Sequence, residues 1–283
     1  MKKALIALVS VLLILMLVVI CACSYVPSTS FLSRTKVNSL VDTYGTPQAV
    51  VTITYSRSDN GTSKERVVTV TYDLLLSQTP IAVIRFIQLA EAGVYNNTII
   101  DTLASNKKHM VMGRYAAIKN DDNSYTYFNR SSDVTFAGEF KSNGYNEPQD
   151  GYAQFSTFSL AMYHDDTKDD SSFNAANGTL ILALSDTPFN SNNYAVFAKL
   201  SSLSYTLDGK QQGSENRKEV PGNIIDDLAS FSSTTSSTKV YDDEEQTTYT
   251  EPRILSTKVI IHVEIKGAPN KSADWSQLPR IGK

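Results

Sequence analysis

Residues 79–100 read TPIAVIRFIQLAEAGVYNNTII and carry the clearest structural signal in the chain. Thr79 and Pro80 suit the cap and the first position of a helix, and Gly93 suits the left-handed position after its last turn. Apolar residues recur at i, i+3, i+4 and i+7, the spacing of one helix face: Val83, Phe86, Ile87 and Ala90. The stretch therefore predicts a helix with one buried face.

On both sides of this helix the chain reads as strands. Segments 48–56 and 66–74 alternate β-branched residues, and Asn60-Gly61 between them is typical of a hairpin turn. Further strands are expected at 98–103, 109–115, 158–163, 179–184, 195–200 and 254–265, and a second helix at 223–231. Strands from both ends of the chain around one core predict a mainly β fold, a closed antiparallel β-barrel with two flanking helices.

Composition excludes several classes of protein. The 283 residues are 41% hydrophobic and include 15 Tyr and 11 Phe, which supply enough apolar bulk for a folded core. Lys and Arg total 26 against 29 Asp and Glu, and they form no basic run, so we expect no nucleic-acid partner. With two cysteines, Cys21 and Cys23, and three scattered histidines, we expect no disulfide framework, no metal site and no cofactor.

The first 22 residues read as a targeting segment. Two lysines precede an almost continuous apolar run at 4–20. The end of that run, Ile20-Cys21-Ala22-Cys23, resembles a bacterial lipobox, in which a small residue precedes the cysteine that receives the lipid. We therefore expect cleavage before Cys23 and lipidation of its sulfur, which anchors the protein at the extracytoplasmic face of the cell membrane. The alternative is an uncleaved N-terminal helix.

The remaining chain divides by composition. Residues 23–46 are rich in Ser and Thr and are expected to form a tether with a short helix at 37–44. A polar stretch with Ser/Thr repeats and an acidic run is expected to be a mobile insertion in the domain. The expected parts are a signal peptide at 1–22, a polar tether at 23–46, a barrel domain at 47–267 with the insertion at 232–251, and a C-terminal tail at 268–283.

A series of motifs, in order along the chain, resembles the cyclophilin family of peptidyl-prolyl isomerases. The helix and the turn after it match that family at Pro80, Val83, Phe86, Gly93, Tyr95 and Thr98. Further matches are Gly138-Glu139-Phe140, Phe158-Ser159-Leu160-Ala161, Asn177-Gly178 and Val196-Phe197. The resemblance implies a cyclophilin-like barrel and an isomerase acting on proline-containing peptides or polypeptide clients.

The same resemblance places the main differences at the reacting centre. Rotation about a prolyl bond crosses a barrier of about 18–20 kcal/mol, so an isomerase must bind the twisted amide best. Cyclophilins use an arginine that donates to the prolyl nitrogen, and in the matching motif its position holds Thr102. Activity is therefore expected to be weak or absent. The other matched groove positions are His109, Met110, Met112, Leu180, Leu182, Phe189 and Tyr194.

Three cations near this motif are candidates to replace the arginine. They are Lys107, Lys108 and Arg114, and we interpret them as ordinary surface charges. Three functions stay open: a lipid-anchored isomerase, a peptide-binding or chaperone-like module without catalysis, and a scaffold for envelope partners. All three share one fold, so the fold does not separate them.

Overall fold

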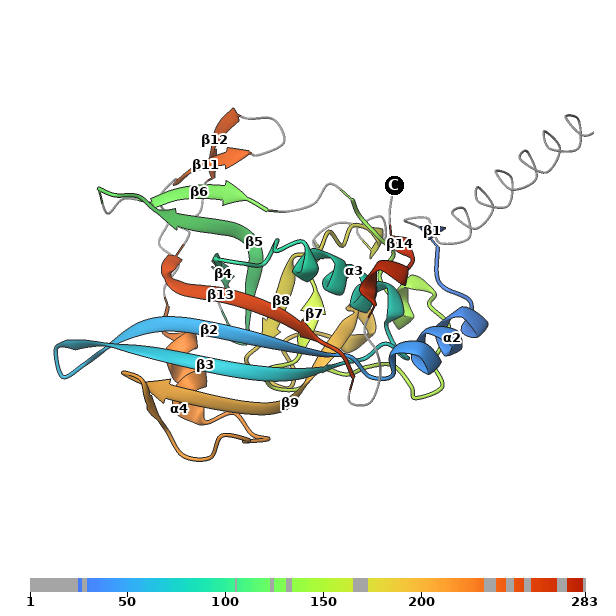
Figure 1. Ribbon diagram of the computed structural model, residues 1–283, viewed down its shortest axis with the longest axis horizontal. Coiled ribbons are helices and arrows are strands. Elements are labelled where there is room, and N and C mark those ends of the chain that lie inside the picture. The colour runs from blue at the N-terminus through green and yellow to red at the C-terminus, as the bar shows by residue number, and fades with distance from the viewer. Residues whose placement is uncertain are drawn as a thin grey trace, which may run out of the picture.

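A computed structural model of the chain describes residues 25–26, 30–104, 106–122, 125–130, 134–164, 173–231, 238–242, 247–251, 256–268 and 274–281. Its barrel strands are β2 (Gln48–Asp59), β3 (Thr62–Leu74), β4 (Thr98–Leu103), β5 (His109–Lys119), β7 (Leu160–Met162), β8 (Leu180–Ala183), β9 (Val196–Leu207) and β13 (Ser256–Lys266). Neighbours pair antiparallel in the order β4, β13, β2, β3, β9, β7, β8, β5, and the circle closes because β5 also pairs with β4 (Figure 1). The predicted closed antiparallel barrel is confirmed.

The barrel closes around one apolar interior because its strands alternate. In β2, buried side chains from Ala49 to Tyr55 are separated by partly exposed ones, and β3 alternates in the same way from Arg66 to Leu74. The buried members join the rings of Phe86 and Phe197 in a single core cluster. Complete burial of one such large apolar side chain contributes about 1.5–3 kcal/mol, so this shared interior is the main stabilising feature.

The predicted first helix is α3 (Pro80–Glu91), and it differs from the prediction in how much of it is buried and in how it is capped. Nearly every side chain of α3 is buried, so the helix lies within the core and not on its surface. The Thr79 hydroxyl does not cap the helix, because it donates to the carbonyl oxygen of Val196 at 3.3 Å. Instead the Glu139 carboxylate accepts the backbone N–H of Ala82 at 2.9 Å. A distant acidic side chain thus satisfies the helix start.

The second predicted helix is α4 (Gly222–Ala229), and α3 and α4 lie toward opposite ends of the β2–β3 pair (Figure 1). Asp227 of α4 has a fully buried side chain that pairs with Arg57 and, at 2.8 Å, with Arg66. The Tyr55 hydroxyl also donates to this carboxylate at 3.1 Å. Burial raises the pKa of Tyr55 to about 12, and the nearby arginines oppose that rise. Two cations therefore compensate the buried carboxylate that joins α4 to the sheet.

A third helix, α2 (Arg34–Tyr44), covers the helix that the sequence predicted at 37–44. Leu40 and Tyr44 of α2 are buried in the main core cluster. The Tyr44 ring stacks on Trp275 with centroids 5.3 Å apart, and its hydroxyl donates to the carbonyl oxygen of Asp274 at 3.0 Å. This part of the expected tether is therefore packed on the barrel, and the expected tail returns to meet it.

Additional strands extend the sheet beyond the barrel. The strand β6 (Tyr125–Asn129) pairs with β5, β11 (Thr238–Asp242) lies parallel to β6, and β12 (Thr247–Glu251) pairs with β11. The strands β11 and β12 lie within the stretch 232–251 that the sequence indicated as an insertion, at segments where Thr, Val and Tyr favour strands. The remaining elements are β1 (Tyr25–Val26), β10 (Lys210–Gln211), β14 (Arg280–Ile281), and the 3₁₀ helices η1 (Lys141–Asn143), η3 (Ser191–Asn193) and η4 (Trp275–Gln277).

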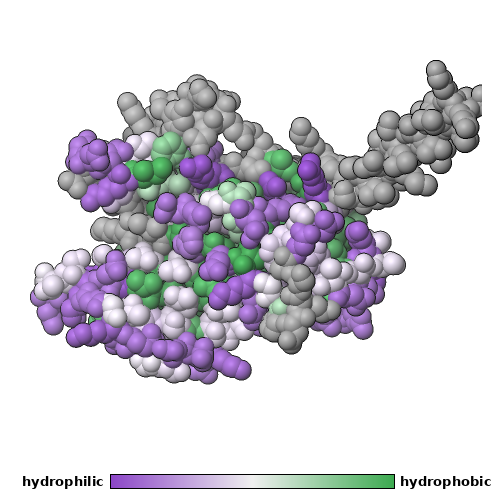
Figure 2. Space-filling model, viewed as in Figure 1, coloured by the Kyte–Doolittle hydropathy of each residue, from purple (hydrophilic) through white to green (hydrophobic). Residues whose placement is uncertain are grey.

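The expected signal peptide and the expected lipid-bearing Cys23 lie outside the described residues. Among the helices that are described, none is long and apolar enough to cross a membrane. The face of the molecule drawn in Figure 2 is mostly hydrophilic, with hydrophobic side chains in separate small areas. Ile118 of β5, 45% exposed, is the large apolar residue that stands out from this pattern in the described chain.

Candidate functional site

One row of side chains crosses five neighbouring strands on the outside of the barrel. Strand pairing places Thr102 of β4 opposite Val111 of β5, and Val111 opposite Ile181 of β8. Ile181 in turn lies opposite Ala161 of β7, which lies opposite Val196 of β9. We call these five residues the outer row. None of them carries a charge, so the outer row is apolar except for the Thr102 hydroxyl.

Alternation along each strand fixes which side chains face outward. In β5 and β8, the neighbours of Val111 and Ile181 are fully buried in the interior cluster with Phe197. Because successive side chains of a strand point to opposite faces, Val111 and Ile181 themselves face outward. The interior neighbours are Met110, Met112, Leu180 and Leu182.

Aromatic side chains cover the outer row. Phe155 and Tyr194 belong to the same apolar cluster as Ala161, Ile181 and Val196, and Phe189 packs against it. The rings of Phe189 and Tyr194 stack with centroids 4.5 Å apart. The row is closed to solvent beneath them: the exposed fraction is 2% for Val111 and 0% for Ile181, Ala161 and Val196.

The covering rings belong to a continuous series of packed rings, here called the ladder, made by His109, Phe189, Tyr194 and His164. His109 packs on Phe189 with ring centroids 4.1 Å apart, and Tyr194 stacks on His164 at 4.6 Å. The His164 Nε2 lies 2.7 Å from the carbonyl oxygen of Asn193, which only accepts, so this nitrogen carries the proton and donates. The hydrogen bond fixes the His164 ring beneath Tyr194, and the ladder holds the 3₁₀ turn η3 in place.

Behind the ladder, Phe140 stacks on His164 with centroids 5.5 Å apart, and the preceding residue is the helix-capping Glu139. Glu139 is 2% exposed, and burial raises the pKa of its carboxyl to about 8. The backbone N–H groups of Ile81 and Ala82 oppose this rise, because they donate hydrogen bonds that favour the ionised form. Neutral donors thus compensate this carboxyl, in contrast to the two arginines around the Asp227 carboxyl.

The three candidate cations have different surroundings. Lys107 and Lys108 are exposed in the loop between β4 and β5. Arg114 is half-buried, and its guanidinium lies 5.0 Å from the ring centroid of Tyr115 and 6.0 Å from that of Tyr163. Because Tyr163 packs against the apolar cluster that contains Ala161 and Ile181, the Arg114 guanidinium lies at the margin of the outer face.

The residues predicted for the site divide into two groups. The structure brings Thr102, His109, Phe189 and Tyr194 together on the outer face. The other four point into the barrel core: Met110, Met112, Leu180 and Leu182. Sequence matching assigned the strand register one residue away from the outward positions. Residues 109–112 and 180–183 are all apolar except His109, so the sequence does not indicate which neighbours face outward.

No curated protein sequence matches the chain. Among solved structures, a cyclophilin-type peptidyl-prolyl cis-trans isomerase of Cryptosporidium parvum has 17% identity and a TM-score of 0.38, covering 76% of this chain and 98% of that one. The same protein in the presence of the dipeptide Ala-Pro gives 14% identity and a TM-score of 0.35, covering 75% and 98% of the two chains.

A cyclophilin of Hirschia baltica has 9% identity and a TM-score of 0.30, covering 60% of this chain and 71% of that one. At the level of sequence families, residues 62–227 match the family described as cyclophilin type peptidyl-prolyl cis-trans isomerase/CLD. This match spans more than half of the chain. The barrel with its flanking helices therefore has a family identity: the chain belongs to the cyclophilin-type peptidyl-prolyl cis-trans isomerase family.

Proposed function

We propose that this protein is an extracytoplasmic, lipid-anchored member of the cyclophilin family that binds proline-containing segments of polypeptides and isomerises them weakly or not at all. The observation that carries the proposal is the uncharged outer row. Thr102 holds the position that the motif match gives to the family's arginine, and the next row members are Val111 and Ile181. Binding of an apolar ring is therefore supported more strongly than catalysis.

The chemical reason lies in the transition state. As the prolyl amide twists, its nitrogen loses conjugation and becomes a better hydrogen-bond acceptor, so a fixed cationic donor stabilises the twisted form selectively. A threonine hydroxyl is neutral, short and free to accept as well as donate. Loss of one well-placed donor costs on the order of 2.7–4 kcal/mol in comparable enzymes, which is about 10²–10³ in rate.

The aromatic cover supports recognition of a proline ring. Phe189 and His109 are both half-buried, so each exposes part of a flat ring at the edge of the outer row. Aromatic faces offer a large apolar contact area at a low cost in conformational entropy. A ring of the client can stack there without any charged group, which fits a site that binds without accelerating rotation.

A protease-coupled assay with a proline-containing chromogenic peptide tests the catalytic part of the proposal. We expect a catalytic efficiency at least one hundredfold below that of an arginine-containing cyclophilin measured in parallel. An efficiency equal to that of the reference enzyme contradicts the proposal. Circular dichroism of the same sample establishes that the low rate comes from a folded protein.

The anchor rests on the sequence around Cys23, which has a small residue before it. Metabolic labelling with a radioactive fatty acid tests this part. The Cys23→Ala variant is expected to lose the label, and Cys21→Ala, which removes the neighbouring thiol, is the matched control that keeps it. Equal labelling of both variants contradicts lipidation at Cys23.

One observation favours a second function, a scaffold for envelope partners. Three outer-row residues are closed to solvent: Ala161, Ile181 and Val196. The rings of Phe155, Phe189 and Tyr194 cover them. In that case the rings are permanent packing and no peptide displaces them. Titration with a proline-containing peptide, followed by amide chemical shifts, separates the two: shifts at Ile181 and Tyr194 support binding, and their absence at millimolar peptide supports the scaffold.

A further inference from the structure

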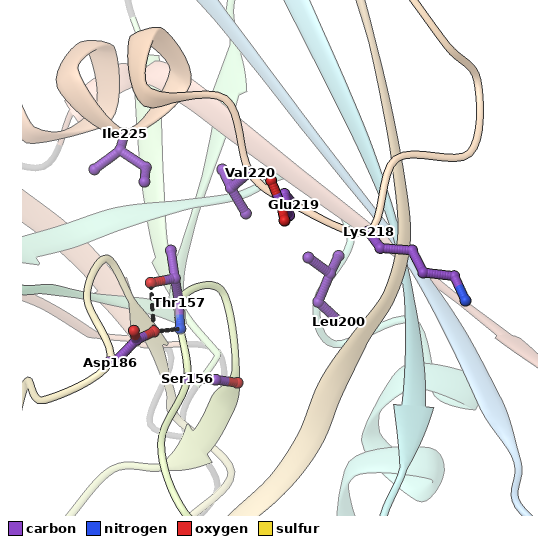
Figure 3. Close-up of a pocket in the computed structure, with 8 residues that line it drawn as sticks. All are labelled: Ser156, Thr157, Asp186, Leu200, Lys218, Glu219, Val220 and Ile225. Carbon is purple, nitrogen blue, oxygen red and sulfur yellow. Dashed lines mark hydrogen bonds between the residues drawn. The ribbon is translucent and has the colours of Figure 1, made fainter.

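A pocket of about 370 Å³ lies between β9, α4 and the segments that flank β7 and β8 (Figure 3). Its apolar wall is made by three half-buried side chains: Leu200 of β9, Ile225 of α4, and Val220 of the loop that precedes α4. Its polar rim comes from Thr157, just before β7, and Asp186, just after β8. The outer row uses Ala161 and Ile181 of the same two strands, so the pocket and the row share their supporting elements.

The Asp186 carboxylate is held in one orientation. One of its oxygens accepts both the backbone N–H and the hydroxyl of Thr157, each at 2.7 Å (Figure 3). These hydrogen bonds keep the pKa of Asp186 below its usual value, since they favour the ionised form. Within the described part of the chain, the other oxygen accepts no hydrogen bond. A fixed negative group with spare acceptor capacity thus borders the apolar wall.

The charges of the pocket favour a cation. Glu219 adds a second carboxylate to the lining, whereas the side chain of Lys218 points away from the other lining residues (Figure 3). Lysine and arginine side chains combine an apolar stem with a cationic end, and they bury the stem against apolar surface while the charge reaches a polar rim. A stem lying on Leu200 and Ile225 brings such an end to Asp186.

We infer that this pocket is a subsite for a lysine or arginine side chain of the bound polypeptide. The inference rests on the proposed function, since it extends the same peptide site. Ser156, which lines the pocket, directly follows Phe155, one of the rings that cover the outer row, so the pocket adjoins this aromatic cover. The chain turns between Ser156 and Ser159, where the Ser159 N–H donates to the Ser156 carbonyl oxygen at 2.8 Å, so the separation between the lysine and the proline is a variable of the experiment.

Fluorescently labelled nine-residue peptides with one proline test the subsite on the full chain in detergent. Each peptide carries one lysine at one to six residues from the proline, or norleucine at the same place as the uncharged match. Lysine is expected to tighten binding about two- to fivefold over norleucine at one or two neighbouring separations and not at the others, the range of an exposed ion pair. The gain is expected to disappear at 1 M salt.

Substitution of the carboxylate provides the decisive comparison. Asp186→Asn keeps an oxygen that accepts from Thr157 but removes the charge, so it is expected to abolish the lysine gain and leave norleucine peptides unaffected. Asp208→Asn is the matched control, because the Asp208 carboxylate also accepts a backbone N–H, that of Glu65 at 2.9 Å, and does not line the pocket. A lysine gain that survives in Asp186→Asn overturns the inference.

Failure of the proposed function is distinguishable from failure of the subsite. A lysine peptide that lacks proline is titrated while the amide signals of Thr157 and Ile225 are followed. If no proline peptide binds but these signals shift, the proposed function fails, and the pocket is a lysine site that does not belong to a proline-peptide site. If proline peptides bind and lysine neither adds affinity nor shifts these signals, the subsite is wrong and the proposed function stands.

Discussion

The inner and outer faces of β5, β7 and β8 are both apolar, but different parts of the molecule cover them. On the inner face, Met110, Leu160 and Leu182 pack into a cluster that draws residues from strands all around the closed barrel and from α3. On the outer face, the cover comes from loop rings such as Phe155 and Phe189. The comparison shows that the inner face is fixed by strand pairing, whereas the outer face depends on loop side chains that can move without opening the barrel.

The largest effect is expected from truncating one phenylalanine on each face, which tests whether the two faces contribute differently to stability. Phe197 of β9 is fully buried in the interior cluster, so Phe197→Ala is expected to lower the free energy of unfolding by about 3–5 kcal/mol. Phe189→Ala removes an equal side chain that is only half-buried, and we expect less than half of that loss. Urea unfolding measures both, and equal losses contradict the distinction between the two faces.

Restoring a cation to the outer row is expected to have the next largest effect. In Thr102→Arg, a guanidinium on β4 can approach the ring of a bound proline, and catalytic efficiency is expected to rise at least tenfold, toward an upper limit of about 10²–10³. Thr102→Lys is the control, because an ammonium carries the same charge without the rigid fork of donors, so a smaller rise is expected. A folded Thr102→Arg protein with an unchanged rate contradicts the role given to this position.

Much of the fold can be predicted from the sequence, because helix ends and apolar periodicity depend on residues close together in the chain. The helix at 80–91 is set by Pro80, the apolar spacing and Gly93, which adopts a positive φ of 73° after the last turn. The sequence could not reveal the capping partner, because Glu139 is distant in the chain and the nearby Thr79 bonds elsewhere. Caps supplied by tertiary contacts leave no signal at the helix itself.

The candidate site was less predictable for a related reason. The side-chain period of a strand is two, so a shift of one residue in matching moves every side chain to the opposite face. In 109–112 and 180–183 all residues are apolar except His109, so both registers read alike. Thr102, Phe189 and Tyr194 lie on the outer face, whereas Met110 and Leu182 of the uniformly apolar segments point into the core.

The interior also predicts a pH dependence, and Glu139 is the group that tests it. The pKa of this carboxyl is about 8 in the folded protein and 4.5 in the reference state, so the native state holds the proton between these values. Native protein therefore binds more protons in this window, and stability is expected to fall as the pH rises from 5 to 8, by at most about 1.4 kcal/mol per pH unit. Glu139→Gln keeps an acceptor for the Ala82 N–H and is expected to flatten the profile.

Urea unfolding at half-unit pH intervals measures this slope. Glu264→Gln on β13 is the control, because it removes an exposed carboxylate and leaves the interior unchanged. The control is expected to keep the slope of the original protein. If Glu139→Gln keeps the same pH slope, burial does not hold a proton on Glu139. The buried carboxyls of Glu139 and Asp227 would then not differ in protonation.

The smallest expected effect belongs to Arg114, whose guanidinium lies at the margin of the outer face over Tyr115 and Tyr163. Stacking on tyrosine contributes about 0.5–1 kcal/mol at partly exposed sites, so Arg114→Met is expected to lower stability by that amount. Residual isomerase activity is expected to stay within about twofold, since a guanidinium held over two rings is not aimed at a bound proline. Arg114→Lys, which keeps the charge, is the matched variant. A tenfold loss of activity in Arg114→Met, without unfolding, instead assigns Arg114 the donor role and makes the protein a catalyst that draws its cation from β5 in place of β4.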